Sequence, residues 1–578
     1  MTADTSIPMS RMSEGPSAAR RWPALAVLCV SLLIVNLDNT VLNVALPTLV
    51  RDLHASDSDL QWIVDSYIMV FAGLLLVAGS LADRIGRKRT FLAGLTAFAA
   101  GSAWAAFSGS VGMLIAARAS MGIGGALMMP STLSIITDMF RDTGERQRAI
   151  GLWAGTSGVG IALGPIVGGL LLAHFWWGSV FLINVPVAVL GIACAIPLVP
   201  DSRNPAALRP DLVGALLSIA GLGLVLWSII EAPVHGWSSA LVITSGVAGL
   251  VILAVFALWE RASSHPLLSL RFFRNRSFSA AVSSVWLVMF GMYGALFVLT
   301  QYLQFSLGYT ALQTGIRVLP AAAAVAVVAP VSAVLIRRAG AKITTAAGLL
   351  IIAAGLWQIS GASVTSTYAD SVAGMIMLGI GAGLAIPCTT ASVMGSVPRG
   401  DTGVGSAANG TFMQVGGALG VAVIGSLLAT RYTDRMTGAL APYHLPHGVE
   451  STILGSIGGA LSVAARIGGM SGQLLEHAAR VAFISGMDLG LVTGAAVGVA
   501  GALIALAALP ARPLAGTSGS PGTTGSPGTT GSPGAGGSPG AGGGTPPETD
   551  TSPAGGVVPG IRPADRGSAP TDMAAGRK

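Results

Sequence analysis

Apolar runs of about 20 residues recur along most of the chain, and the charged residues gather in the short segments between them. A helix of about 20 residues is long enough to cross the ~30 Å hydrocarbon core of a bilayer. The pattern therefore predicts an all-α, polytopic membrane protein. Its fourteen expected membrane-spanning helices cover residues 23–47, 61–82, 90–108, 112–137, 148–173, 179–199, 211–231, 240–260, 278–302, 311–336, 343–362, 371–396, 404–429 and 481–509.

The composition excludes an ordinary soluble protein. Hydrophobic residues make up 52% of the chain and charged residues only 10%, against roughly 25% charged residues in a soluble domain. A soluble fold of this composition would lack the polar surface needed to cover itself. The expected partner of the helices is the lipid bilayer.

Basic residues are distributed unevenly between the two sides that fourteen spans define. Most arginines fall in the segments that share a side with the N-terminus, and the positive-inside rule makes that side cytoplasmic. Both termini are then expected in the cytoplasm, and the net charge of +7 is a sign of topology and not of nucleic-acid binding. The opposite side receives only Arg51, Arg431, Arg435, Arg466 and Arg480.

An internal repeat divides the chain. The segment "GSLADRIGRKR" at 79–89 is echoed by "AVLIRRAGAKI" at 333–343, with Gly86 matching Gly340 at a constant offset of 254. Parallel repeats that flank a central site are a common plan of secondary transporters. We predict two six-helix bundles, helices 1–6 and 9–14, with two helices inserted between them.

The predicted domains follow from this repeat. They are a cytoplasmic N-terminal segment (1–22), an N-terminal bundle (23–199), two inserted helices (211–260), a C-terminal bundle (278–509) with an external loop (431–480), and a tail (511–578). Within this loop, residues 451–469 are apolar enough for a fifteenth span, but Arg466 and the even number of spans favour a hairpin that rests on the outer surface. Glycine at every third position of part of the tail fits the collagen period, but the low-complexity composition favours disorder.

Asp38 is the only ionisable side chain between Pro23 and Leu46. A buried carboxylic acid without a partner stays neutral, whereas a nearby cation favours its ionised form. Arg118 lies within another apolar run and needs a partner or a water-filled cavity. A conformational change that moves Asp38 between these two settings would load and release a proton. The alternatives are that Asp38 caps an unwound backbone and that Arg118 binds a backbone carbonyl.

Asp65 is a second acid within an apolar run, about one turn into the second predicted helix. This position is expected to be shallow and near the outer mouth. Asp65 is predicted either to attract cationic substrates or to lie in the membrane interface.

Several motifs, in order, carry a family resemblance: "LDNTVLNVALP", "GSLADRIGRKRT", "RASMGIGGA", "GIALGPIVGG", "FLINVP" and "ASVMGSVPRGDTGVGSAANGTFMQVGGALG". Together they resemble the major facilitator superfamily, and more narrowly its fourteen-span drug:proton antiporter branch. The resemblance covers about residues 23–510. It implies two six-helix bundles, alternating access and export of drugs.

The resemblance implies a gating motif in the loop at 79–89. Glycines in this loop allow a tight turn and close helix approach, and its charges can form a switchable cluster, although an ordinary basic inner loop would look similar. The gating residues are Gly79, Asp83, Arg84, Gly86, Arg87 and Lys88.

A second motif marks antiporters in the family. Its glycines stand four residues apart on one helix face, where another backbone can approach closely, and Gly151 and Gly155 extend the ridge inward. Plain small-residue packing is the alternative. The motif residues are Gly160, Gly164, Pro165, Gly168 and Gly169.

Aromatic and methionine side chains on two helices suggest an adaptable wall for apolar substrates. Ordinary helix packing would give the same spacing. The candidate substrate-binding residues, besides Asp65, are Trp286, Met289, Phe290, Tyr293, Phe297, Phe412, Met413 and Gln414.

These features predict a proton-coupled exporter of amphipathic drugs, dyes or antibiotics in a bacterial cytoplasmic membrane, or else a transporter of one endogenous metabolite. Seven scattered histidines, without metal-ligand spacing or a nucleophile–base arrangement, argue against an enzyme and against a metal site. No GxxxxGK[ST] motif occurs, so we expect the proton gradient to drive transport without a cofactor. The sequence leaves the substrate, the direction of transport and the oligomeric state open.

Overall fold

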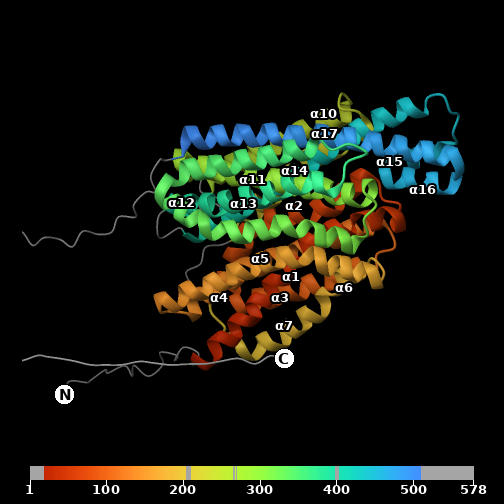
Figure 1. The fold of residues 1–578 in the computed structure, drawn as a ribbon. Helices are drawn as coiled ribbons and strands as arrows, with labels where there is room; N and C mark the ends of the chain where they lie inside the picture. The colour runs from red at the N-terminus through yellow and green to blue at the C-terminus, as the bar shows by residue number, and fades with distance from the viewer. Residues whose placement is uncertain (1–17, 204–209, 264–266, 268–269, 398–401, 510–578) are drawn as a thin grey trace, which may run out of the picture. The chain divides into compact units, whose positions relative to one another are not determined.

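The computed structural model describes residues 18–203, 210–263, 267, 270–397 and 402–509. Most of the predicted N-terminal segment and the whole predicted tail (511–578) lie outside these ranges. The described residues form helices and connecting turns, with no strand among them (Figure 1). The helices are α1 (Ala18–Leu53), α2 (Asp57–Ile85), α3 (Arg87–Ala106), α4 (Val111–Met139), α5 (Thr143–His174), α6 (Ser179–Leu182), α7 (Asn184–Leu198), α8 (Leu212–Ile230), α9 (Ala232–His235), α10 (Ala240–Ala262), η1 (Leu270–Arg274), α11 (Arg276–Gln301), η2 (Tyr302–Ser306), α12 (Ala311–Ser360), α13 (Tyr368–Gly395), α14 (Thr402–Leu440), α15 (His447–Gly455), α16 (Ile457–Ile467) and α17 (Gly469–Ala508).

Every predicted span overlaps a helix, although the span at 179–199 is divided between α6 and α7. Twelve helices of the described chain are long and apolar enough to cross a membrane. The twenty-residue helix α3 is not among these twelve, and α12 covers two predicted spans in 50 residues. The count of fourteen crossings therefore stays a prediction, although the helices it requires are present.

The repeat predicted from the sequence has a backbone counterpart. Gly86, between α2 and α3, has a φ of 123°, and Gly340, inside α12, has a φ of 81°. Residues with a Cβ rarely adopt such φ angles, so glycine allows the sharp turn of the backbone at both places. The hydroxyl of Thr90 donates to the Gly86 carbonyl at 3.0 Å, and that of Thr344 donates to the Gly340 carbonyl at 2.9 Å. The long helix α12 is thus two helices joined at Gly340.

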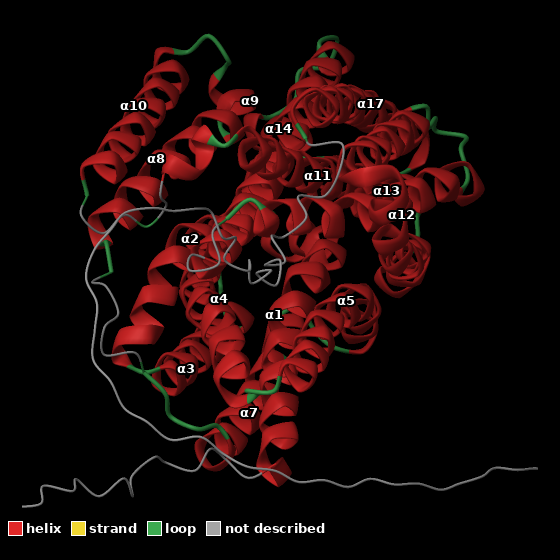
Figure 2. Cartoon of the chain, turned by 90° about the vertical axis from the view of Figure 1, so that its left-hand side faces the viewer, coloured by secondary structure: helices red, strands yellow, loops and turns green. Residues whose placement is uncertain are grey.

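The helices pack in two groups. In the first, α1 contacts α5 and α7, while α4 contacts α2 and α3; in the second, α11 contacts α13, α14 and α17, and α12 contacts α13 and α17. The groups meet where α2 contacts α14 and where α5 contacts α12. The inserted helices α8 and α10 lie side by side at the edge of the protein, and α8 also contacts α2 and α14 (Figure 2).

The segment predicted as an external loop is mostly helical. Helices α14 and α17 run about ten residues past the predicted spans, and α15 and α16 connect them at one end of the helices (right in Figure 1). The α16 helix packs against α1 and α17, and the hydroxyl of Tyr432 on α14 donates to the carbonyls of Ile453 and Ser456 at 2.8 and 3.1 Å. This cap therefore touches helices of both groups.

The two helix groups contact each other closely at the end that carries α15 and α16, and they separate toward the opposite end. A Cβ built at Gly169 of α5 would come within 2.5 Å of Leu312 Cα on α12, and the side-chain amide of Gln304 donates to the Val44 carbonyl at 2.9 Å. At Gly151 and Gly155, nearer the other end of α5, a Cβ would meet nothing within 4 Å. The predicted inward extension of the glycine ridge is therefore wrong for this conformation, because no helix lies against it.

Candidate functional site

A charge pair is sealed inside the first helix group. Arg118 of α4 donates from one terminal nitrogen to Asp38 Oδ2 of α1 at 2.5 Å, and both side chains are 1% exposed. Arginine insertion alone costs roughly 2.5–3.5 kcal/mol at the membrane centre, and the carboxylate compensates this cost. The sequence prediction that the two residues act together has the geometry it requires.

The surroundings of the pair exclude one of the predicted alternatives and contain the other. Helix α1 runs without interruption to Leu53, so Asp38 does not cap an unwound segment. Asp38 lies about 22 Å from the C-terminal end of α1 at 1.5 Å per residue. The Arg118 Nε donates to the Ile63 carbonyl of α2 at 3.2 Å, so the arginine binds a backbone carbonyl in addition to the carboxylate.

Asn184 is a buried hydrogen-bond partner of Asp38 that the sequence reasoning did not single out. Its side-chain nitrogen donates to Asp38 Oδ1 at 3.0 Å and contacts Ser102 Oγ at 3.3 Å. Asn184 begins α7 and is fully buried. A polar residue inside the apolar motif "FLINVP" was the signal that could have identified it.

Two aromatic rings complete the enclosure of the pair. The guanidinium carbon of Arg118 lies 4.4 Å from the ring centre of Tyr67 and 5.9 Å from that of Phe181. Rings at such distances attract a cation through their electron-rich faces. Four helices (α1, α2, α4 and α7) and the short helix α6 thus hold a positive charge beside one carboxylate.

Asp65 is buried, which corrects the sequence interpretation. Its side chain is 0% exposed, and neither carboxylate oxygen has a hydrogen-bond partner among the described residues. Burying an ionised carboxylate without a partner is costly, so the neutral acid is the form that fits this place. Asp65 follows Gln61 by one helical turn, and Gln61 accepts a hydrogen bond from Ser426 of α14 at 3.1 Å. It therefore lies on the side of α2 that faces the second helix group and not in the membrane interface.

The predicted gating loop forms a cluster within the first helix group. Arg87 Nε donates to Asp83 at 2.8 Å, and a terminal nitrogen of Arg87 pairs with Asp138 of α4. The Lys88 ammonium donates to the Ile196 carbonyl of α7 at 2.6 Å. Burial lowers the pKa of Arg87, but hydrogen bonds and attraction from both carboxylates outweigh burial and raise it overall. The loop therefore stays charged and braces α2, α4 and α7 at the end where the two helix groups separate.

The glycines and the arginine of this loop are not equivalent. Gly86 needs its positive φ, whereas the nearest atom to a Cβ at Gly79 would be Pro130 Cβ at 3.8 Å, an ordinary contact. The expectation that Gly79 allows close helix approach is wrong. Arg84 is exposed, and its predicted role stays a prediction.

The predicted antiporter motif is a packing ridge with two faces. A Cβ at Gly160, Gly164 or Gly168 would lie 3.0, 1.8 or 2.9 Å from atoms of α1. On another face, Gly169 lies against α12, and the Pro165 carbonyl would lie 2.1 Å from a Cβ at Gly315. Helix α5 thus packs closely against α1 of its own group and against α12 of the second group.

Much of the predicted substrate wall packs against α14 in this conformation. Cβ atoms at Gly416, Gly417 and Gly420 of α14 would lie 2.2–3.2 Å from Trp286, Tyr293 and Phe290 of α11. Met289, Phe290 and Phe297 are buried, while Phe412, Met413 and Gln414 are partly exposed. Contact with substrate therefore stays a prediction for these residues.

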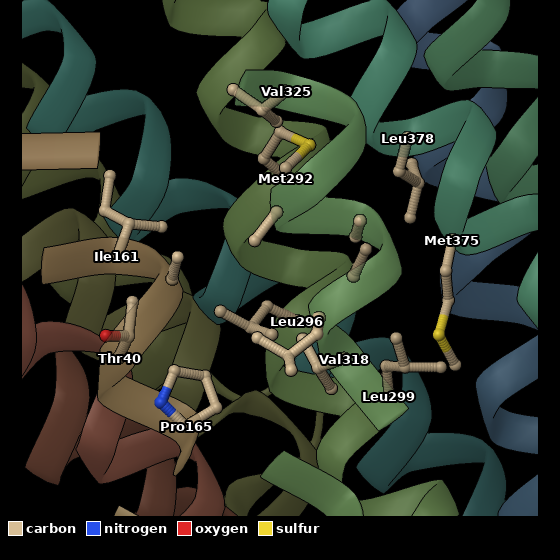
Figure 3. Close-up of a pocket in the computed structure, with 15 residues that line it drawn as sticks. Thr40, Ile161, Pro165, Met292, Leu296, Leu299, Val318, Val325, Met375 and Leu378 are labelled. Atoms are coloured by element: carbon tan, nitrogen blue, oxygen red, sulfur yellow. The ribbon is translucent and has the colours of Figure 1, made fainter. Parts of the chain in front are cut away.

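An apolar cavity lies on a different face of α11. It is lined from one side by Thr40, Ile161 and Pro165 and from the other by Met292, Leu296 and Met375, among others (Figure 3). The cavity thus lies between α1 and α5 of the first group and α11, α12 and α13 of the second. It presents almost no polar surface, which suits the apolar part of a ligand.

Helix α1 connects the charge pair with this cavity. Asp38 and Thr40 are two residues apart, so they point about 200° apart around the helix. Asp38 faces α4 and α7, whereas Thr40 faces α5, where a Cβ at Gly164 would meet its hydroxyl at 1.8 Å. Helix α1 is thus a wall shared by the two sites.

Comparisons with known proteins place these features in context. The family model described as Major Facilitator Superfamily matches residues 28–421. The chain is 34% identical to the tetracenomycin C resistance and export protein of Streptomyces glaucescens, over 89% of this chain and 97% of that protein. It is 36% identical to a multidrug efflux pump of Mycolicibacterium smegmatis, over 85% of this chain and 99% of that protein. A crystal structure of a bacterial homolog to the human lysosomal transporter Spinster aligns with a TM-score of 0.57 at 18% identity, over 85% and 98% of the two chains, and shares the fold.

Proposed function

Because the chain belongs to the Major Facilitator Superfamily, we propose that it is a proton-coupled antiporter that exports amphipathic drugs, dyes or antibiotics from a bacterial cell by alternating access. The relatives are bacterial resistance and efflux proteins, and the family is one of membrane transporters and not of enzymes. The proposed route leads across the cytoplasmic membrane, with fourteen spans and both termini inside. No cofactor is needed in this proposal.

The observation that carries the proposal is the sealed pair of Asp38 and Arg118. In this conformation Asp38 is the ionised partner of a cation. When a proton reaches the carboxylate, the ion pair is lost, and Arg118 keeps only its carbonyl and aromatic contacts. Removing one partner of a buried pair costs about 3–5 kcal/mol, so protonation favours a different arrangement of α1 and α4.

Substrate enters the proposed cycle on the other side of α1. The apolar cavity beside Thr40 would hold the apolar part of an amphipathic compound, and α1 would pass the movement between the two sites. The closed end bearing α15 and α16 is external in the proposed topology, so this conformation faces inward. The motion of one proton through ~150 mV supplies ~3.5 kcal/mol. That energy sustains a gradient of several hundred-fold at 1.4 kcal/mol per tenfold.

The test is transport by the full chain in proteoliposomes with an imposed pH gradient, across a panel of cationic dyes, neutral dyes and antibiotics. We expect accumulation driven by the pH gradient and abolished by a protonophore. Transport that ignores the pH gradient would contradict proton coupling. Transport of a single antibiotic from the panel would favour the narrower specificity that the name of the Streptomyces relative suggests.

A further inference from the structure

We propose that the end of α10 and the short segment η1 form a binding site for the headgroup of an anionic phospholipid. A cavity of about 470 Å³ lies there, outside the helices that hold the charge pair. Its walls combine two cations, Arg261 and Arg274, with the apolar side chains of Ala257, Leu258, Leu270 and Phe273. A phospholipid is complementary to these walls, because its negative phosphate lies beside apolar acyl chains.

The two arginines have no acidic partner within the described part of the chain. Neither takes part in a salt bridge there, and the sequence contains no aspartate or glutamate between Arg261 and Asp370. The adjacent Glu260 is buried on the side of α10 that faces α8, where its Oε1 lies 2.8 Å from a Cβ built at Gly214. A negative group from outside the chain would therefore complement these charges.

The apolar walls point to lipid and not to a free anion. Helix α10 is one of the membrane-span candidates, and its most apolar window is only 11% buried within the protein. Leu258 is 61% exposed and Trp259 is 42% exposed at the same end of the helix. Tryptophan prefers the headgroup level of the membrane. The site thus opens toward the bilayer at the depth where a phosphate lies.

The position of the site gives the inserted helices a role. Phe273 lines the cavity and also packs against Phe278 and Phe412, with ring centres 5.2 and 5.8 Å apart. Phe412 belongs to α14, which contacts α2 in the other helix group. A bound lipid would therefore brace η1 between α10 and the inner end of α14.

The experiment uses the full chain, purified in a neutral detergent and titrated with dioleoyl phosphatidylglycerol or dioleoyl phosphatidylcholine while bound lipid is counted by native mass spectrometry. We expect preferential binding of phosphatidylglycerol. Replacement of Arg261 or Arg274 by glutamine should weaken it about fivefold each, and the double replacement about 25-fold. The matched control is Arg271→Gln, because Arg271 is an exposed arginine of η1 that does not line the cavity.

Two further variants keep the test independent of folding defects. The double change of Arg261 and Arg274 to lysine keeps both charges and should retain most of the affinity. Ala257→Trp keeps all charges but fills the cavity, and it should abolish the preference. An equal loss in Arg271→Gln would show that general surface charge attracts the lipid and would overturn the site. Displacement of the lipid by inorganic phosphate in large excess would overturn it as well, in favour of a simple phosphate site.

Discussion

Replacement of Asn184 by alanine is expected to move the pH dependence of transport without destroying the charge pair. Asn184 donates to Asp38 Oδ1 at 3.0 Å and is fully buried. This hydrogen bond stabilises the ionised carboxylate more than the neutral acid. Without it, the ionised form of Asp38 loses part of its stabilisation.

The size of the shift follows from the charge on the acceptor. A hydrogen bond to a charged group contributes about 1.5–3 kcal/mol, and 1.36 kcal/mol corresponds to one pH unit. The midpoint of the pH profile should therefore move about one to two units in the alkaline direction. The assay is the proton release that substrate addition triggers in detergent-purified protein, followed with a pH-sensitive dye across a range of starting pH values.

The matched control is Asn43→Ala. Asn43 is also buried on α1, but its amide donates to the Asn39 carbonyl of its own helix at 3.0 Å. We expect its midpoint to match that of the unaltered protein. An unchanged midpoint in a well-folded Asn184→Ala protein, or a shift toward acid, would refute the argument that Asn184 stabilises ionised Asp38.

Three further predictions concern other parts of the fold. Asp65→Leu should raise the thermal unfolding temperature by a few degrees, because it removes two buried oxygens that have no partner among the described residues and that cost about 1–3 kcal/mol; a lower temperature would point to a hidden partner. Gly164→Val should prevent the packing of α5 on α1 at Thr40, so the yield of monodisperse protein should be lost. Gly155→Val is the control: a Cβ there meets nothing within 4 Å, so the yield should be nearly normal. Gly86→Ala should lower the free energy of unfolding by about 1 kcal/mol or more, because Gly86 has a positive φ of 123°. Gly79→Ala should be neutral, and equal effects of the two changes in a denaturation assay would contradict the role given to the φ of Gly86.

The sequence predicted the helices and the repeat because both leave strong local signals. Apolar runs of membrane length marked the long helices, and the matching of Gly86 with Gly340 anticipated two turns that need a positive φ. Helix ends were harder to predict, because α1, α14 and α17 continue as helices beyond the apolar runs, through segments that include charged residues.

The site was only partly predictable for a physical reason. An isolated charge in an apolar run must find a partner, so Asp38 and Arg118 could be paired from sequence. Asn184 and Ser102 are uncharged, and nothing in the pattern showed which way they point. The depth of Asp65 and the face of α11 that lines the cavity depend on how α2, α11 and α14 pack, which no local pattern records.

The central claim is that Asp38 carries the coupled proton, and Asp38→Asn tests it most directly. An amide keeps the shape and can still accept from Arg118 through its single oxygen, but it cannot titrate. The measurement is pH-gradient-driven efflux of one cationic and one neutral dye in vesicles with matched protein content. We predict that the variant still binds both dyes and exchanges them down their gradients, yet concentrates neither. Active efflux of both dyes at the rates of the unaltered protein would contradict the account.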